Sequence, residues 1–143
     1  MTEGEPGRGA GRPGPRQDAR VTAPFRIRNI LTLPRTQEIA HGGSGYISAV
    51  RVAARAELAG SCEFIDYAEV PPGGSIGDHR HSAQEEEFYL VLSGTGTMRL
   101  EADTVAVTAG DLIRNPAGGL HGLTNTGGEV LRLFIFALTL ALE

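Results

Sequence analysis

The sequence predicts an all-β domain, either a sandwich or a small barrel, and three observations carry this prediction. Short runs rich in β-branched and aromatic residues recur along the chain from Phe25 onward. Glycine-rich turns separate these runs, which is the pattern typical of sandwiches and barrels. With 143 residues, an apolar fraction of 41% and no internal repeat, the chain has the size of one domain with one core.

Residues 1–23 differ in composition from the rest of the chain. They contain five glycines, three prolines and four arginines, and very few sizeable apolar side chains. Such a segment cannot bury enough surface to offset the entropy lost on ordering. We therefore expect a disordered arm over residues 1–23, followed by a β-barrel domain over residues 24–143.

The first half of the domain contains two clear strand patterns and two ambiguous segments. Leu31–His41 is either irregular or holds one short strand, whereas Tyr46–Val52 reads as a strand. A helix is expected only over Ala53–Leu58. Cys62–Val70 predicts a further strand, whose odd- and even-numbered residues face opposite sides, and the turn Pro71–Gly74 ends it.

The second half continues the β pattern. Phe88–Leu92 is almost wholly apolar, as expected for a strand covered on both faces. Turns at Ser93–Gly96 and Ala109–Asp111 punctuate the segments that follow. The remaining predicted strands are Thr97–Glu101, Thr104–Thr108, Leu112–Arg114, His121–Asn125 and Val130–Leu140.

Composition excludes several classes of function. The net charge of −4 argues against a general nucleic-acid-binding protein. Cys62 is the single cysteine, so neither an internal disulfide nor a multi-cysteine metal cluster can form. All thirteen basic residues are arginine, which excludes a Schiff-base lysine and a P-loop lysine. Because no apolar run approaches the length of a membrane span and no secretory signal is recognisable, we expect a cytoplasmic protein without a membrane segment.

Three of the four histidines occur in spacings that suit a metal site. His79 and His81 are separated by one residue, so on a strand their side chains share a face. Both imidazoles could then reach one metal ion at about 2.1 Å. Glu87 opens the next predicted strand, and His121 comes from a strand that could fold back across the barrel to supply a third imidazole.

The segment around His121 resembles the second motif of the cupin superfamily. That motif reads G, five residues, PxG, two residues, H, three residues, N. Every fixed position has its counterpart in this chain, at Gly110, Pro116, Gly118, His121 and Asn125.

The segment around His79 resembles the first cupin motif, with one departure. Gly73, His79 and His81 match the pattern of G, five residues, HxH. The acidic residue that follows is ambiguous, because the loop is one residue longer than the usual pattern. Glu87 has the correct spacing to Gly94, and we favour it because a strand fixes spacing more rigidly than a loop. Glu86 is the alternative.

The resemblance covers roughly residues 62–138 and implies a fold and a cofactor. It implies a single jelly-roll barrel, frequent homodimers and one divalent metal ion. By the same resemblance His79, His81, Glu87 and His121 would be the metal ligands. Such a ligand set suits Fe, Mn, Ni, Co or Zn and does not select among them.

Three further residues are candidates for the pocket. His41 is either a surface loop histidine or a catalytic acid, base or substrate contact from the N-terminal segment. Tyr67 and Arg114 are candidate substrate-pocket donors, with ordinary strand positions as the alternative reading.

The resemblance implies a metal-dependent enzyme acting on a small organic substrate in a barrel pocket, of cyclase, dioxygenase or isomerase type. An arginine-rich, lysine-free chain suggests a GC-rich bacterial genome, where such cupins often belong to natural-product biosynthesis. The alternative is a non-catalytic cupin that binds or senses a small molecule. A sugar-nucleotide epimerase fits less well, because those cupins need no metal triad. The sequence leaves the substrate open.

Overall fold

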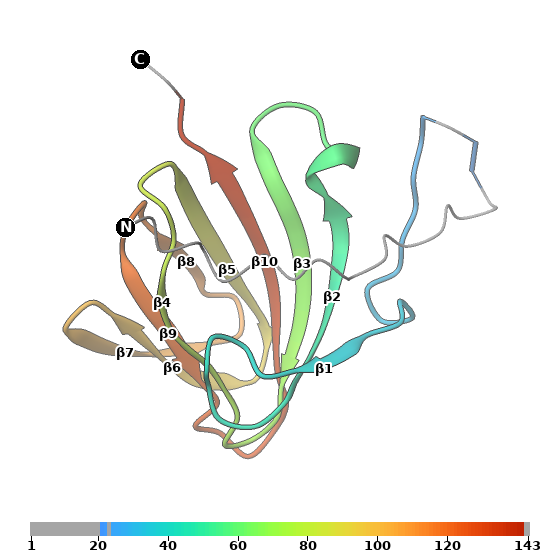
Figure 1. Cartoon of the computed structure of the whole chain (residues 1–143). Coiled ribbons are helices and arrows are strands. Elements are labelled where there is room, and N and C mark those ends of the chain that lie inside the picture. The colour runs from blue at the N-terminus through green and yellow to red at the C-terminus, as the bar shows by residue number, and fades with distance from the viewer. Residues whose placement is uncertain (1–20, 23, 142–143) are drawn as a thin grey trace.

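The computed structural model describes residues 21–22 and 24–141, so nearly all of the expected disordered arm, residues 1–23, lies outside the described residues. Within the described part, ten strands and one short 3-10 helix (η1) follow one another (Figure 1). Their bounds are β1 Thr36–Glu38, β2 Ile47–Ala54, η1 Arg55–Glu57, β3 Cys62–Val70, β4 Ser75–Arg80, β5 Glu85–Ser93, β6 Thr95–Leu100, β7 Asp103–Thr108, β8 Leu112–Asn115, β9 Leu120–Thr124 and β10 Leu131–Thr139.

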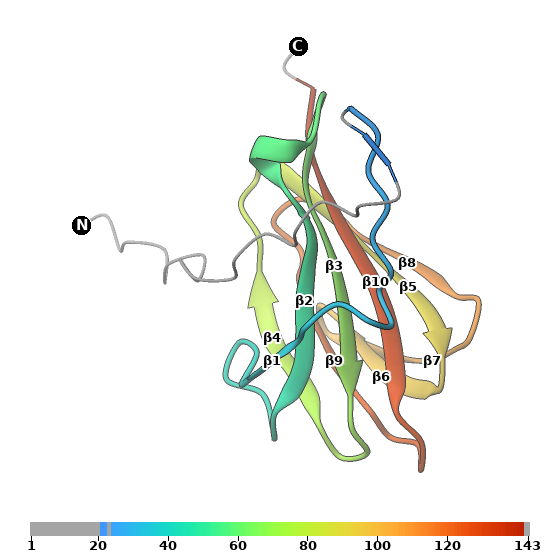
Figure 2. The same ribbon diagram turned by 90° about the vertical axis from the view of Figure 1, so that its right-hand side faces the viewer.

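The strands form two sheets in which every neighbouring pair is antiparallel. A six-stranded sheet has the order β1-β2-β3-β10-β5-β8, and a four-stranded sheet has the order β4-β9-β6-β7. The chain crosses repeatedly between the sheets, so that β4 and β9 lie together although they are far apart in the sequence (Figures 1 and 2). The architecture is all-β, as the strand pattern predicted, and it is the jelly-roll barrel that the resemblance implied.

The hydrophobic core lies between the two sheets. Ala68 and Leu133 from the six-stranded sheet belong to the same buried cluster as Met98 and Leu123 from the four-stranded sheet, and each is at most 2% exposed. Burying a side chain of leucine or methionine size contributes roughly 1.5–3 kcal/mol. Strand alternation therefore identifies the inner face of each strand, and this inner face also carries the polar cluster described below.

Two expectations about individual elements need correction. Ala53 and Ala54 continue β2 instead of starting a helix, because they pair with β3, and only the single turn η1 follows them. Tertiary pairing outweighs the high helix propensity of this alanine-rich segment, because such propensities are worth well under about 1 kcal/mol per residue. β5 begins already at Glu85, so the acidic run belongs to the strand, and Leu92 is 40% exposed, so β5 is not covered on both faces along its whole length.

Candidate metal centre

Four side chains with metal-ligating atoms meet on the inner face of the barrel. Their ligand atoms all lie within 4.8 Å of one another. His79 comes from β4 and faces His121 across the β4–β9 pair, His81 follows the end of β4, and Glu87 reaches in from β5 of the opposite sheet. The structure thus brings together the four residues that the two motifs nominated, with Glu87 and not Glu86 in the cluster.

One oxygen of Glu87 is the meeting point of the three imidazoles. Its Oε1 atom lies 3.0 Å from Nε2 of His121 and 3.0 Å from Nε2 of His81. Nε2 of His79 lies 3.9 Å away. Burial opposes ionisation of Glu87, but hydrogen bonds from the histidines outweigh it and hold its pKa well below the ordinary value. The centre therefore offers a buried carboxylate anion surrounded by three imidazoles.

The opposite ring nitrogens of these histidines have partners that orient the rings. Nδ1 of His79 lies 2.7 Å from the carbonyl oxygen of Gly77, and Nδ1 of His121 lies 3.3 Å from that of Gly119. Nδ1 of His81 lies 3.8 Å from a carboxylate oxygen of Glu85. An acceptor at Nδ1 favours the tautomer with the proton on Nδ1, so that Nε2 could bind a metal once the metal replaces the proton donated to Glu87.

These residues fit a divalent first-row cation. The donor set combines three imidazole nitrogens with one ionised oxygen, and Glu87 and His121 are only 4% and 1% exposed. A buried carboxylate with three converging Nε2 atoms is the arrangement that such a cation would stabilise. The residues do not select among iron, manganese, nickel, cobalt and zinc.

His41 lies against this centre without belonging to it. Its ring stacks on that of His79, with centroids 3.6 Å apart and planes 7° from parallel. The loop that carries it is fastened to β4, since the amide of Gly77 donates to the carbonyl of Ala40 at 3.0 Å. Burial, followed by the neighbouring His79, lowers the pKa of His41 to about 4, so its ring is neutral at pH 7.

The other two candidate pocket residues lie elsewhere. The Tyr67 hydroxyl donates to Glu69 at 2.8 Å and its ring lies beneath Arg35, on the outer face of the six-stranded sheet. Arg114 is exposed and donates to Glu86 at 2.7 Å. Because side chains alternate along a strand, both point away from the face that carries Glu87. The structure therefore does not bring Tyr67 or Arg114 to the cluster.

Three residues of the inner face were not singled out from the sequence as site residues. Glu85 is 7% exposed and lies beside His81, and the Tyr89 ring meets His121 edge-on, with centroids 5.6 Å apart. Counting back and forward by two from Glu87 would have found both. Asn115 pairs with Glu87 across the β5–β8 ladder, and no single-strand pattern reveals that register.

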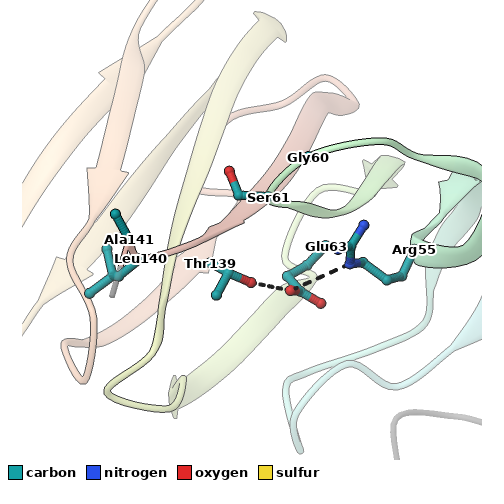
Figure 3. Close-up of a pocket in the computed structure, with 7 residues that line it drawn as sticks. All are labelled: Arg55, Gly60, Ser61, Glu63, Thr139, Leu140 and Ala141. Carbon is teal, nitrogen blue, oxygen red and sulfur yellow. Dashed lines mark hydrogen bonds and ion pairs between the residues drawn. The ribbon is translucent and has the colours of Figure 1, made fainter. Parts of the chain in front are cut away.

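A shallow pocket at another place on the surface has no part in this cluster (Figure 3). Its volume is about 390 Å³, and none of the four cluster residues lines it. The Glu63 carboxylate inside it accepts a hydrogen bond from Thr139 and lies 3.8 Å from Nε of Arg55. Its charged groups are therefore already matched. Nowhere in residues 21–22 and 24–141 is there a helix with the length and apolar character to span a membrane.

Comparison with known proteins reveals relatives of the same fold. The chain is 25% identical over 114 residues to the oxalate-binding protein of Thermotoga maritima, an alignment that covers 80% of this chain and 93% of the relative. A crystal structure described as a predicted oxalate decarboxylase from Thermotoga maritima matches with a TM-score of 0.76 and 23% identity, covering 80% of this chain and 99% of the other. A putative sugar phosphate isomerase from Acidithiobacillus ferrooxidans matches with a TM-score of 0.65 and 22% identity, covering 78% of this chain and 71% of the other.

The family model for the cupin domain matches residues 66–137. This range runs from the middle of β3 nearly to the end of β10 and contains all four residues of the histidine–glutamate cluster. It comprises half of the chain, so the protein belongs to the cupin family.

Proposed function

We propose that the protein is a metal-dependent cupin that holds one divalent ion with His79, His81, Glu87 and His121 and acts on a small organic acid that chelates this ion. The observation that carries the proposal is the convergence of three Nε2 atoms and one buried carboxylate within 4.8 Å. Four protein ligands leave two positions of an octahedral ion for a bidentate carboxylate. The name of the oxalate-binding relative supports this class of ligand.

The exposure of the cluster supports a small ligand. The side chains of His121 and Glu87 are 2% and 5% exposed, whereas that of His81 is 19% exposed. A ligand would therefore approach from the side of His81, where the cluster is least buried. Such restricted access favours a molecule of a few heavy atoms that can displace water from the ion.

Catalysis, as opposed to binding alone, is supported by His41. A divalent ion would polarise a bound carbonyl or carboxylate and, if it is iron, would also permit oxygen chemistry. Because the neutral ring of His41 stacks on a proposed ligand histidine, we propose that it exchanges a proton with the bound substrate. The alternative is a non-catalytic cupin that binds its ligand, which the name of the relative favours.

The metal premise is tested by elemental analysis and calorimetry. Purified protein loaded separately with Fe²⁺, Mn²⁺ and Zn²⁺ should retain about one ion per chain, and the loaded protein should bind oxalate in a titration. His79→Ala and His121→Ala should lose both the ion and oxalate binding. Retention of a full ion by both variants would contradict the proposed centre.

Turnover separates the enzyme from the binding protein. Candidate organic acids are incubated with each metal form, and oxygen uptake, carbon dioxide release and product formation are followed. His41→Ala should lower the rate of an enzymatic reaction while metal content stays unchanged. Ligand binding without turnover for every metal would support the alternative. The homodimer implied by family resemblance stays a prediction, which sedimentation equilibrium can check.

A further inference from the structure

Asn115 carries a buried amide that no protein group satisfies. The residue is 1% exposed, and neither Nδ2 nor Oδ1 has a hydrogen-bond partner within the described part of the chain. Buried side-chain amides in folded proteins nearly always bond to protein, water or a ligand. The Nδ2 donor and the Oδ1 acceptor of Asn115 would both be satisfied by a bound molecule that offers one acceptor and one donor.

Another buried asparagine shows what a structural amide looks like in this fold. Asn125 is 2% exposed, but its Nδ2 atom donates to the carbonyls of Val70 at 2.9 Å and Glu129 at 2.7 Å. Its Oδ1 atom accepts from the amide of Gly127 at 2.9 Å. Asn125 thus ties a turn together, whereas Asn115 makes no such connection.

The position of Asn115 puts its side chain on the same face of the sheet as Glu87. On the β5–β8 ladder it stands opposite Glu87, whose carboxylate is the centre of the cluster. Its neighbour Arg114 faces outward, and Ile113 beyond it packs against the core, so Asn115 lies on the inner face. Side chains opposite each other on one face of an antiparallel pair begin about 5 Å apart. Asn115 therefore lies beside Glu87, on the face where a ligand of the ion would be held.

We propose that Asn115 is a specificity-determining residue that hydrogen-bonds the edge of the ligand facing away from the metal. Its Nδ2–H group donates to a free oxygen of the ligand, and its Oδ1 atom accepts from an N–H or O–H group beside that oxygen. This inference rests on the proposed function, and it narrows the ligand class. The preferred ligand is a short chelating carboxylate with an adjacent carboxamide or hydroxyl group.

A ligand with a hydrogen-bond donor fits the Asn115 amide better than a simple dianion does. A fully ionised dicarboxylate offers only acceptors, so it would leave Oδ1 of Asn115 opposite another oxygen. Arg51, which pairs with Asp66 across the β2–β3 ladder, already donates to the Asp66 carboxylate at 2.9 Å. The far edge of the ligand thus meets a neutral amide that supplies one donor and one acceptor.

The test compares oxamate, which has a carboxamide, with oxalate, which lacks a donor. Both are titrated by calorimetry into metal-loaded wild-type protein and into the Asn115→Leu and Asn115→Ala variants. We expect the wild type to bind oxamate about tenfold more tightly than oxalate. Both variants should lose that preference and keep one ion per chain. Ligand-free Asn115→Leu should melt no lower than the wild type, because it removes an unpaired amide.

Three results would overturn the inference, and they can be told apart from failure of the proposed function. Equal preference for oxamate in the wild type and both variants would show that Asn115 does not contact the ligand. Loss of the metal in the variants would make Asn115 a part of the metal site instead. A lower melting temperature of Asn115→Leu, comparable to that of the control Asn125→Leu, would indicate a structural amide. If the wild type binds its ion but neither compound, the proposed function fails and this inference fails with it.

Discussion

Glu87 determines the electrostatics of the centre because its Oε1 atom lies within 3.9 Å of an Nε2 atom of each of the three histidines. A carboxylate that is 4% exposed would ordinarily resist ionisation, yet the hydrogen bonds from His121, His79 and His81 keep its pKa low. The same oxygen would bind a cation in place of those imidazole protons. Metal affinity should therefore depend on the groups that keep each imidazole in its unprotonated, correctly turned state.

Glu85 provides a residue-scale prediction of this dependence. Its carboxylate lies 3.8 Å from Nδ1 of His81, so Glu85→Gln should weaken metal binding by about tenfold. Glu86→Gln is the matched control, because Glu86 lies next in the same strand but pairs with Arg114 on the outer face. Competition titration with a chelating dye gives both affinities. Equal losses in the two variants would contradict a role for Glu85 in orienting His81.

At the scale of elements, the loop before β2 and strand β4 behave as one unit. The amides of Gly77 and Ser75 donate to the carbonyls of Ala40 and Ser44, at 3.0 and 2.9 Å. This close approach requires a residue without a side chain at position 77, because a Cβ atom there would collide with the carbonyl oxygen of His41. We call these two hydrogen bonds between the loop and β4 the clamp, and they hold the loop where the His41 ring stacks on that of His79.

Gly77→Ala should open this clamp. The added methyl group collides with backbone, which cannot move like a flexible side chain, so we expect a loss of about 1–3 kcal/mol in the free energy of unfolding. Urea denaturation of metal-free protein measures the loss, and the NMR signals of the His41 ring report its separation from His79. Gly128→Ala is the control, since a Cβ atom there meets nothing within 4 Å. A Gly77→Ala variant as stable as Gly128→Ala would refute the clamp.

The elements also show which parts of the molecule a single sequence can predict. Alternation and turn residues predicted the strands well, and motif spacing nominated Glu87 over Glu86, because strand geometry is a local property. Ala53–Leu58 misled the helix prediction since pairing with β3, a contact between segments, determines its conformation. The stacking of His41 on His79 depends on where a loop is placed, and the pairing of Asn115 with Glu87 depends on strand register. Neither loop placement nor strand register can be predicted from the local pattern of a single sequence.

At the scale of the whole molecule, two buried tyrosines on opposite faces of the six-stranded sheet make the fold sensitive to alkali. Burial, followed by its hydrogen bond with Glu69, raises the pKa of Tyr67 to about 12. Burial, followed by the charge of Glu87, raises the pKa of Tyr89 well above its ordinary value. The chain has no lysine to titrate in the same range, so alkaline unfolding should report chiefly on such tyrosines.

Tyr67 gives the sign and the pH window of this effect. Its pKa is about 10 in the unfolded chain and about 12 in the folded protein, so between these values the folded state holds more protons. Stability from this group is fully present below pH 10 and is lost as the pH rises toward 12, on the order of 1–2 kcal/mol.

Urea unfolding of metal-free protein at pH 8, 10 and 11 should show this fall. Tyr67→Phe, which cannot ionise, should start about 1 kcal/mol less stable at pH 8 and then fall less steeply. Glu69→Gln should also flatten the profile, because it removes the charge that helps to raise the pKa. If all three proteins lose stability in parallel above pH 10, Tyr67 is not the group that makes the barrel alkali-sensitive.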